Sequence, residues 1–171
     1  KNIDELEEKF ASLKILDPAC GSGAFLIKAV DILLEIHKEI QIFKQDEGQY
    51  TAVKRKLKKK KDKGQLMLVE WNEEDEARKI IESNIYGVDL NEESVEITKL
   101  SLFLKIAKKN RKLMDLSQNI KCGNSLIDNI DIDSKAFNWG EEFKTIIDKG
   151  GFDIVIGNPP YVRSRELFSK D

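Results

Sequence analysis

Four short apolar segments constrain the fold of this chain, because each one runs directly into glycine, proline, aspartate or asparagine. They occupy residues 14–17, 84–89, 119–122 and 152–156. Between most of them, apolar residues recur every three or four positions, which is typical of amphipathic helices. Strands that alternate with helices predict an α/β fold, with a parallel sheet of about four strands and helices on both faces.

The helical segments are expected at residues 3–13, from 24 to about 43, 73–83 and 139–148, with a further helix that begins after Asn91. Asn91 is a suitable N-cap for that helix, since Glu92 and Glu93 follow in its first turn. The helix becomes apolar nearly all round between Leu100 and Ile106, which predicts that it is deeply buried.

Residues 54–63 include eight basic side chains in ten, within an apparent basic insertion at about residues 46–66. The insertion is either a solvated, mobile segment or a surface that contacts DNA phosphates. The second interpretation predicts affinity that is independent of DNA sequence and sensitive to salt.

Composition excludes several classes of protein. The chain has 171 residues, of which 40% are hydrophobic, and this suits one domain with a real core. Its 29 Lys and Arg against 31 Asp and Glu do not indicate a nucleic-acid binder. The sequence shows no secretory signal and no apolar run long enough to span a membrane. Two cysteines are too few for a disulfide scaffold and indicate a reducing, cytoplasmic location.

The chemistry of the chain collects where the predicted strands end. In open parallel sheets, ligands bind beyond the carboxyl ends of the strands. Here those ends are residues 17–23, 89–91, 123–125 and 158–161, and five of the ten glycines lie in or beside them. The plainer alternative is that glycine and proline only terminate the strands.

The first two strand ends suit a nucleoside-containing ligand. Gly21 and Gly23 form a turn that lets a ligand approach the backbone and directs the next helix N-terminus toward it. The dinucleotide fingerprint is incomplete, because Leu26 stands where its third glycine belongs. Asp89 can accept hydrogen bonds from two ribose hydroxyls, or it can instead cap the helix near Asn91.

The last strand end is suited to a planar group that bears an amine. Pro159 and Pro160 lack backbone donors, and Pro159 favours an extended Asn158. Tyr161 adds a flat aromatic face beside these carbonyl acceptors.

Together, four motifs resemble the amino-methyltransferases of DNA, above all the adenine-specific methylase domains of restriction-modification enzymes. The motifs are Asp17-Pro-Ala-Cys-Gly-Ser-Gly-Ala-Phe-Leu26, Gly87-Val-Asp-Leu90, Cys122-Gly-Asn-Ser-Leu126 and Phe152-Asp-Ile-Val-Ile-Gly-Asn-Pro-Pro-Tyr-Val162. The resemblance extends from about residue 14 to 163, and it is to the type IIG, Eco57I-like methylases. It implies a Rossmann-like class I fold that depends on S-adenosylmethionine. Since only about 25 residues separate Leu126 from Phe152, the motif order resembles the gamma class, whose recognition domain follows the catalytic one.

The resemblance also implies the cofactor-binding residues. Asp17, Ala19, Gly21 and Gly23 match the motif that lines the methionine part of S-adenosylmethionine. Asp89 matches the acid that binds the ribose, and Leu90 its apolar neighbour near the adenine ring. Asn124 matches the position, often Asp, that reads the adenine amine of the cofactor, and its side-chain carbonyl can still accept one hydrogen bond.

The same family flips its target adenine out of the duplex, and the resemblance implies the catalytic residues Asn158, Pro159, Pro160 and Tyr161. The Asn158 side-chain carbonyl and the Pro159 backbone carbonyl match acceptors for the adenine amine. Tyr161 matches the ring that stacks on the flipped base. No metal is expected, because His37 is the only histidine and reads as a structural residue in a long helix. Cys20 fits the small-residue position of the glycine turn and has no redox role.

The family has seven strands where four are found here, and the first residue is Lys1. We therefore expect residues 1–171 to be the N-terminal, cofactor-binding part of a catalytic domain from a prokaryotic enzyme, inactive alone. Double-stranded DNA is the expected partner of the full-length protein, and a target-recognition domain and a fused nuclease are the further domains that the resemblance leads us to look for outside residues 1–171. The alternatives are a protein glutamine methyltransferase, an RNA amino-methyltransferase and a non-catalytic cofactor-binding module. A nicotinamide oxidoreductase is a more distant one.

Overall fold

The computed structural model describes residues 3–58, 72–106 and 114–159, without the side chains of residues 45–58. In chain order its elements are α1 (Ile3–Ser12), β1 (Ile15–Asp17), α2 (Ala24–Lys58), α3 (Glu73–Asn84), β2 (Ile85–Asp89), α4 (Glu92–Lys105), β3 (Ile120–Cys122), α5 (Trp139–Glu142), α6 (Lys144–Ile147) and β4 (Ile154–Val155). The alternation of strands and helices confirms the α/β prediction. No helix of the described residues is long and apolar enough to cross a membrane.

The described strands form one parallel sheet of four, in the order β3-β2-β1-β4. Ile15 of β1 is paired with Ile85 of β2 on one side and with Ile154 of β4 on the other. The chain therefore steps outward from β1 to β3 and then returns past both inner strands to form β4. This order brings the carboxyl ends of β1, β2 and β4 next to one another.

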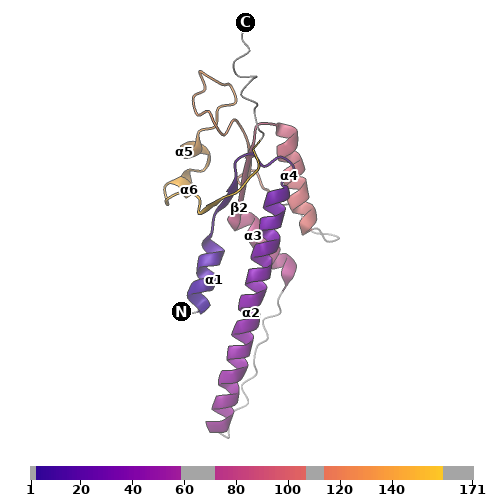
Figure 1. Ribbon diagram of the computed structural model, residues 1–171, viewed down its shortest axis with the longest axis vertical. Helices are drawn as coiled ribbons and strands as arrows, with labels where there is room; N and C mark the ends of the chain where they lie inside the picture. The colour runs from indigo at the N-terminus through magenta and orange to yellow at the C-terminus, as the bar shows by residue number, and fades with distance from the viewer. Residues whose placement is uncertain (1–2, 59–71, 107–113, 160–171) are drawn as a thin grey trace.

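Helices cover both faces of the sheet, as predicted (Figure 1). Successive strand residues point to opposite faces, so Ile15 and Ile85 belong to one core and Leu16 and Val88 to another. The first core is filled from α2, α3 and α4 by Leu26, Val30, Leu33, Ile80, Ile81, Val95 and Leu102. The second is mainly aromatic and contains Phe137, Phe143 and Ile146, with Tyr86, Trp139 and Phe152 packed against it.

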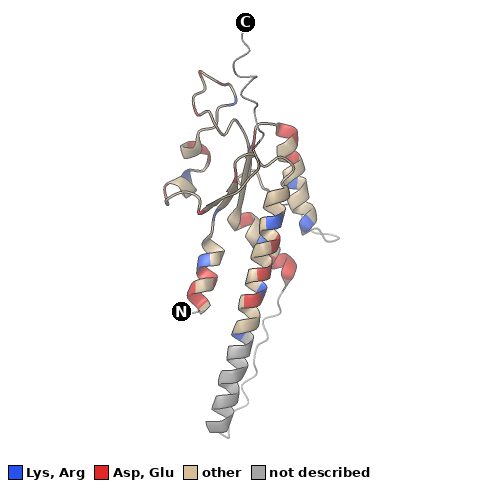
Figure 2. Cartoon of the chain, viewed as in Figure 1, with Lys and Arg blue, Asp and Glu red and all other residues tan. Residues whose placement is uncertain are grey.

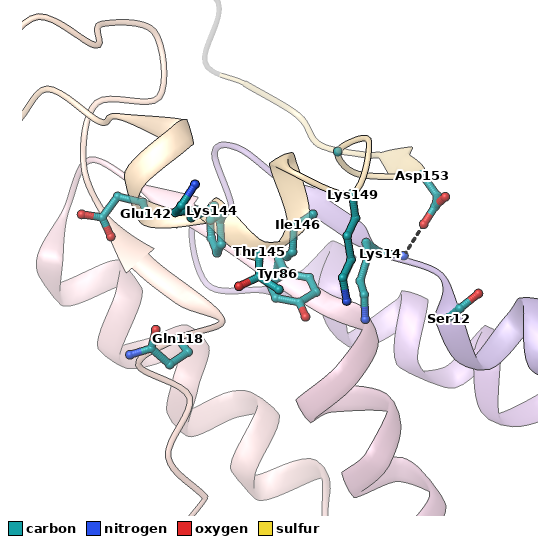
Figure 3. Close-up of a pocket in the computed structure, with 12 residues that line it drawn as sticks. Ser12, Lys14, Tyr86, Gln118, Glu142, Lys144, Thr145, Ile146, Lys149 and Asp153 are labelled. Carbon is teal, nitrogen blue, oxygen red and sulfur yellow. Dashed lines mark hydrogen bonds between the residues drawn. The ribbon is translucent and has the colours of Figure 1, made fainter.

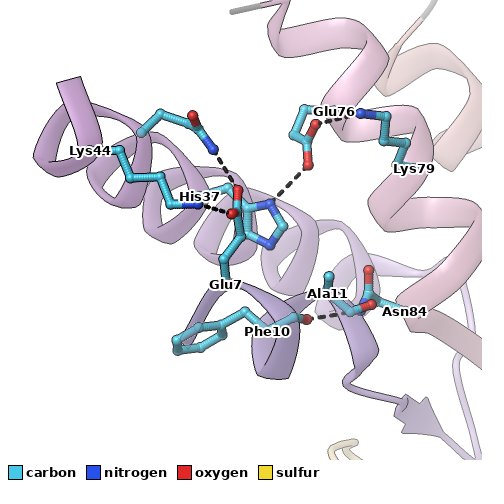
Figure 4. A network of polar contacts seen from close by, with 9 residues as sticks. Glu7, Phe10, Ala11, His37, Lys44, Glu76, Lys79 and Asn84 are labelled. Carbon is cyan, nitrogen blue, oxygen red and sulfur yellow. Dashed lines mark hydrogen bonds and ion pairs between the residues drawn. The ribbon is translucent and has the colours of Figure 1, made fainter. Parts of the chain in front are cut away.

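Polar contacts attach α1 to α2 and α3 (Figure 4). Glu7 of α1 accepts a hydrogen bond from Gln41 of α2 at 2.6 Å and pairs with Lys44. His37 of α2 is buried, and its Nδ1 lies 2.9 Å from Glu76 Oε1 of α3. This position agrees with the structural role predicted for His37.

Two buried asparagines satisfy the carbonyls at helix ends. The Asn84 amide donates to the carbonyls of Phe10, Ala11 and Leu13, at 3.2, 3.1 and 2.7 Å. The Asn119 amide does the same at the end of α3, where it donates to Glu82 at 3.0 Å and to Ile85 at 2.9 Å. Carbonyls in the last turn of a helix have no partner within the helix, so these side chains join each helix end to the next element.

Three predicted boundaries were wrong. The second helix was predicted to end near Phe43, but α2 continues to Lys58. The helix predicted at 139–148 is two short helices, α5 and α6, separated at Phe143. The last strand is Ile154–Val155 and not the whole of 152–156. The basic run at 54–63 lies outside the residues whose side chains the structure describes.

The deep burial predicted for α4 was also wrong. Leu102 is fully buried and Ile106 is 8% exposed, but Leu100 and Leu104 are 54% and 62% exposed. The helix packs on α2, β2 and β3 with one side only. Ile97, Leu100 and Leu104 follow one another at helical spacing on the opposite side, where no described element covers them.

Candidate functional site

The carboxyl ends of β1 and β2 hold two aspartates joined through the glycine turn. Asp17 is the last residue of β1 and Asp89 the last of β2. The backbone N–H of Gly21 donates to Asp89 Oδ2 at 2.8 Å. The structure therefore brings the first two predicted motifs together at one edge of the sheet.

Asp17 is a buried carboxyl with unused hydrogen-bonding capacity. Its side chain is only 1% exposed, and Oδ1 accepts the N–H of Ala19 at 3.0 Å. Oδ2 is buried and has no partner. Burial raises the pKa of Asp17, and the charge of Asp89 raises it further, against the opposing effect of the Ala19 hydrogen bond. A buried oxygen of this kind is a good acceptor for an N–H or ammonium group of a ligand.

The turn after Asp17 depends on two glycines with positive φ. Gly21 has φ +54°, and a Cβ atom placed on it would meet nothing within 4 Å. Gly23 has φ +81°, and a Cβ atom there would lie 2.9 Å from Thr98 Cγ2. The turn is thus open to a ligand at Gly21 and closed by α4 at Gly23.

Thr98 is a residue that the sequence analysis missed. It is fully buried in α4, and its hydroxyl donates to the Gly21 carbonyl at 2.8 Å, which fixes the turn against that helix. The only signal in the sequence is its helical spacing from Val95 and Leu102, which places a small polar residue on the apolar face of the helix. Cys20 packs in the same place, and burial raises the pKa of its thiol to about 11. A raised pKa disfavours the thiolate, which is the reactive form of a cysteine.

Asp89 is held by the backbone on both sides. Oδ1 accepts the N–H of Asn91 at 2.9 Å, and Oδ2 accepts that of Gly21. Each carboxylate oxygen has room for a second donor, so both interpretations of Asp89, as a structural acid and as a ribose ligand, fit this geometry. Leu90 follows with half of its surface exposed, as an apolar contact for a ligand needs. Asn91 caps α4, as predicted, by accepting the N–H of Glu93.

Asn124 lies beyond β3 and is joined to Asp133, an acid in the 128–133 loop that the sequence analysis did not single out. Its Nδ2 donates to Asp133 Oδ2 at 2.7 Å, and its Oδ1 accepts the N–H of Leu126 at 3.1 Å. The Lys135 backbone N–H and then Asn124 hold the pKa of Asp133 below its usual value. These hydrogen bonds favour the ionised form of Asp133, which accepts from the Asn124 amide and orients it, leaving one lone pair of Asn124 Oδ1 for a ligand.

The end of β4 reaches the same edge of the sheet. A Cβ atom on Gly157 would lie 2.7 Å from Asp17 Oδ1, so only glycine lets this segment pass so close to the first motif. Asn158 and Pro159 follow, and both are exposed. Pro160 and Tyr161 lie outside the described residues. Half of the predicted catalytic motif is thus placed beside the predicted cofactor motif.

A family model described as Eco57I restriction-modification methylase matches residues 83–171. The matched part begins just before β2 and includes Asp89, Asn124 and Asn158. Asp17 and the glycine turn precede it.

Three curated relatives match a larger part of the chain. A putative type II restriction enzyme and methyltransferase from Methanocaldococcus jannaschii is 33% identical over 80% of this chain and 10% of its own length. The type II restriction enzyme and methyltransferase RM.Eco57I from Escherichia coli is 28% identical over 97% of this chain and 16% of its own. The adenine-specific methyltransferase PglX from Lacticaseibacillus casei is 23% identical over 90% of this chain and 10% of its own. The chain therefore spans only a small fraction of each relative.

Proposed function

The chain belongs to the Eco57I restriction-modification methylase family, and from this we propose that it is the cofactor-binding part of a DNA adenine-N6 methyltransferase module. The observation that carries the proposal is the convergence of Asp17, Asp89 and the Gly157-Asn158 segment at one edge of the sheet. This convergence supports the proposal, because the transfer of a group between two bound molecules requires a cofactor motif and a base motif side by side.

S-adenosylmethionine is the usual methyl donor of such enzymes and supplies an activated methyl group when bound. The residues present fit it. Asp17 offers a buried, unpartnered oxygen to the methionine ammonium, and the open space at Gly21 lets the ligand lie against the backbone. Asp89 offers acceptors to the ribose hydroxyls, Leu90 an apolar contact to the adenine ring, and Asn124 a carbonyl to the adenine amine.

On the substrate side, we assign Asn158 and Pro159 the role of accepting hydrogen bonds from the target amine. These bonds draw the nitrogen lone pair out of the ring and orient it toward the methyl group. The motif gives Tyr161 the role of stacking on the flipped base, a contact worth roughly 1–3 kcal/mol. The motif gives Pro160 the role of restricting the backbone next to Asn158. These roles are positioning and electrostatic, with no covalent intermediate on the protein.

DNA is the substrate proposed from the relatives, two of which are named as restriction enzymes and methyltransferases and one as adenine-specific. Charge alone does not support a DNA surface. Among the described residues, Lys and Arg are interspersed with Asp and Glu along the helices (Figure 2). Contact of the basic run at 54–63 with DNA phosphates stays a prediction, as do a cytoplasmic location, a fused nuclease and a separate recognition domain.

Replacement of Asn158 by alanine in the complete protein tests the proposal. We expect loss of tritiated methyl transfer to DNA, with cofactor affinity close to that of the wild type by calorimetry. The exposed Asn129, in the 128–133 loop, supplies the matched control Asn129→Ala, which should keep both properties. An Asn158→Ala variant that retains much of the wild-type rate would contradict the proposed role.

The nature of the substrate is tested separately. Mass spectrometry of nucleosides after incubation with DNA should show N6-methyladenine. Methylation of an RNA or of a protein glutamine in place of DNA would select one of the alternative amino-methyltransferases. Cofactor binding without any methyl transfer would indicate a non-catalytic module.

A further inference from the structure

A cavity of about 440 Å³ lies at the end of the sheet opposite the cofactor motif (Figure 3). Lys14, which precedes β1, and Tyr86, near the start of β2, form part of its wall. Residues of α5, α6 and the turn that follows them form the other side. A ligand in this cavity is separated from Asp17 by the length of β1, and it has no direct part in methyl transfer.

Two lysines direct their ammonium groups into the same part of this cavity. Figure 3 shows the Lys14 and Lys149 side chains extending side by side toward Tyr86. Burial lowers the pKa of Lys14, and the positive charge of Lys149 lowers it further, against the opposing effect of Asp153. Lys14 Nζ donates to the Ser83 carbonyl and lies 5.8 Å from the centre of the Tyr86 ring. The two lysines therefore repel each other across a shared space.

The nearby acidic groups have other partners. Glu142 pairs with Lys121 at 2.8 Å, and Asp153 Oδ2 accepts the backbone N–H of Lys14 at 2.7 Å. No ion pair involves Lys149 among the residues that the structure describes. Lys144, the third lysine of the lining, pairs with Asp148 at 2.9 Å, so Lys14 and Lys149 are the two positive charges left with only partial compensation, which favours an anion.

The cavity also has an aromatic and apolar wall. Tyr86, Phe143 and Ile146 line it, and the rings of Tyr86 and Phe143 meet edge to face with their centroids 5.7 Å apart. A volume of this size is in the range of small-molecule pockets and exceeds what a bare phosphate fills. The wall therefore suits a flat organic group attached to the anion.

We propose that this cavity binds a phosphate monoester that carries a planar group, such as a mononucleotide. The dianionic phosphate lies between Lys14 and Lys149, and the planar group lies along the half-buried Tyr86, whose ring is supported from behind by the buried Phe143. Lysine is a common phosphate ligand, and two ammonium groups match the two charges of a phosphate monoester.

The test uses uridine 5′-monophosphate as the probe, on the complete protein with the cofactor site filled by S-adenosylhomocysteine. Calorimetry should show saturable binding that is tighter than that of uridine or of inorganic phosphate alone. Lys149 is exposed, so Lys149→Ala should fold normally and weaken binding about tenfold, as expected for loss of one charge-assisted hydrogen bond. Lys9→Ala removes an equal charge from α1 and should leave binding unchanged.

Four outcomes of the binding measurements overturn the proposal, and a competition experiment supplies a fifth. The four are absence of saturable binding, equal affinity for uridine, equal affinity of the Lys149→Ala variant, and an equal loss in Lys9→Ala. Displacement of the probe by a short DNA duplex in the wild type, but not in Lys149→Ala, would assign the site to a phosphodiester backbone and also overturn the mononucleotide.

Discussion

Replacement of Gly23 by alanine tests whether α4 closes the glycine turn after β1, as the structure indicates. The new Cβ atom lies 2.9 Å from Thr98 Cγ2 and 3.1 Å from Thr98 Oγ1, on a backbone with φ +81°. A left-handed conformation costs an L-residue about 1–2 kcal/mol. Crowding in a well-packed interior adds about 1–3 kcal/mol. The free energy of unfolding should therefore fall by about 2–5 kcal/mol.

Gly21→Ala is the matched control for this change. Gly21 also has a positive φ, but a Cβ atom on it meets nothing within 4 Å. Only the backbone cost of about 1–2 kcal/mol applies. The difference between the two variants thus measures the contact with Thr98 rather than the conformation of the turn.

A double-mutant cycle with Thr98→Ser isolates that contact. Serine lacks Cγ2, the closest atom to the new methyl group, but keeps the hydroxyl that donates to the Gly21 carbonyl. Gly23→Ala should lower the free energy of unfolding by less in the Thr98→Ser background than in the wild type. The coupling energy between the two substitutions should be about 1 kcal/mol or more. Urea unfolding followed by circular dichroism gives all four values. Equal costs for the two glycine variants, or a coupling of zero, would refute the packing described for this turn.

Three further predictions concern binding, pH and helix capping. Gly21→Ala fills the open space of the turn, so the affinity of the complete protein for S-adenosylmethionine, measured by calorimetry, should fall at least tenfold. An unchanged affinity would indicate that the cofactor does not bind at this turn. Burial raises the pKa of Asp17 in the fold from its ordinary 3.8, so the stability linked to its proton is complete below that value and is lost as the pH rises through the raised pKa. In urea unfolding, the free energy of unfolding of Asp17→Asn should therefore exceed that of the wild type by about 1 kcal/mol at pH 7 but not at pH 3. A difference that does not change with pH would contradict this. Asn84→Ala removes the Asn84 donor from the carbonyls of three residues, so the free energy of unfolding should fall by about 1–3 kcal/mol. Amide hydrogens of α1 should exchange faster in this variant than in the matched variant Asn119→Ala.

The sheet could be predicted from the sequence because short apolar runs and helical periodicities are local signals. All four strands lie in the predicted segments, and their parallel order follows from the helices between them. The end of α2 could not be predicted, because the apolar period fades after Phe43 although the helix continues. The break at Phe143 depends on the ring entering the aromatic core, which is a tertiary effect.

The exposed side of α4 shows where periodicity misleads. A helix that is apolar all round is buried only when other elements surround it. Here α2, β2 and β3 cover the side with Leu102, and the stripe of Ile97, Leu100 and Leu104 faces away from them. The pattern of apolar residues therefore describes what the helix can bury, and the number of covering layers decides what it does bury.

Only those residues of the candidate site that lie directly at the ends of strands could be predicted from the sequence. Asp17, Gly21 and Asp89 are brought together because parallel strands end at one edge. Asp133 and Thr98 were missed, since their roles depend on a loop and a helix that pack back onto this edge. Contacts that depend on long-range packing produce no regular spacing of residues in the sequence, so they could not be predicted from it.

The placement of Asp17 supports the proposed ligand site at this edge of the sheet over the alternative that the strands merely end there. Burial of its carboxyl opposes ionisation, and one oxygen is left without a donor. A fold selected only for stability has no use for such a group, because an apolar or fully bonded residue would be less costly at this position. Gly157 also has to remain glycine to accommodate the Asp17 oxygen at close range. An acid that destabilises its own surroundings, and that two strand ends are shaped to accommodate, is best explained by a ligand that supplies the missing hydrogen bond.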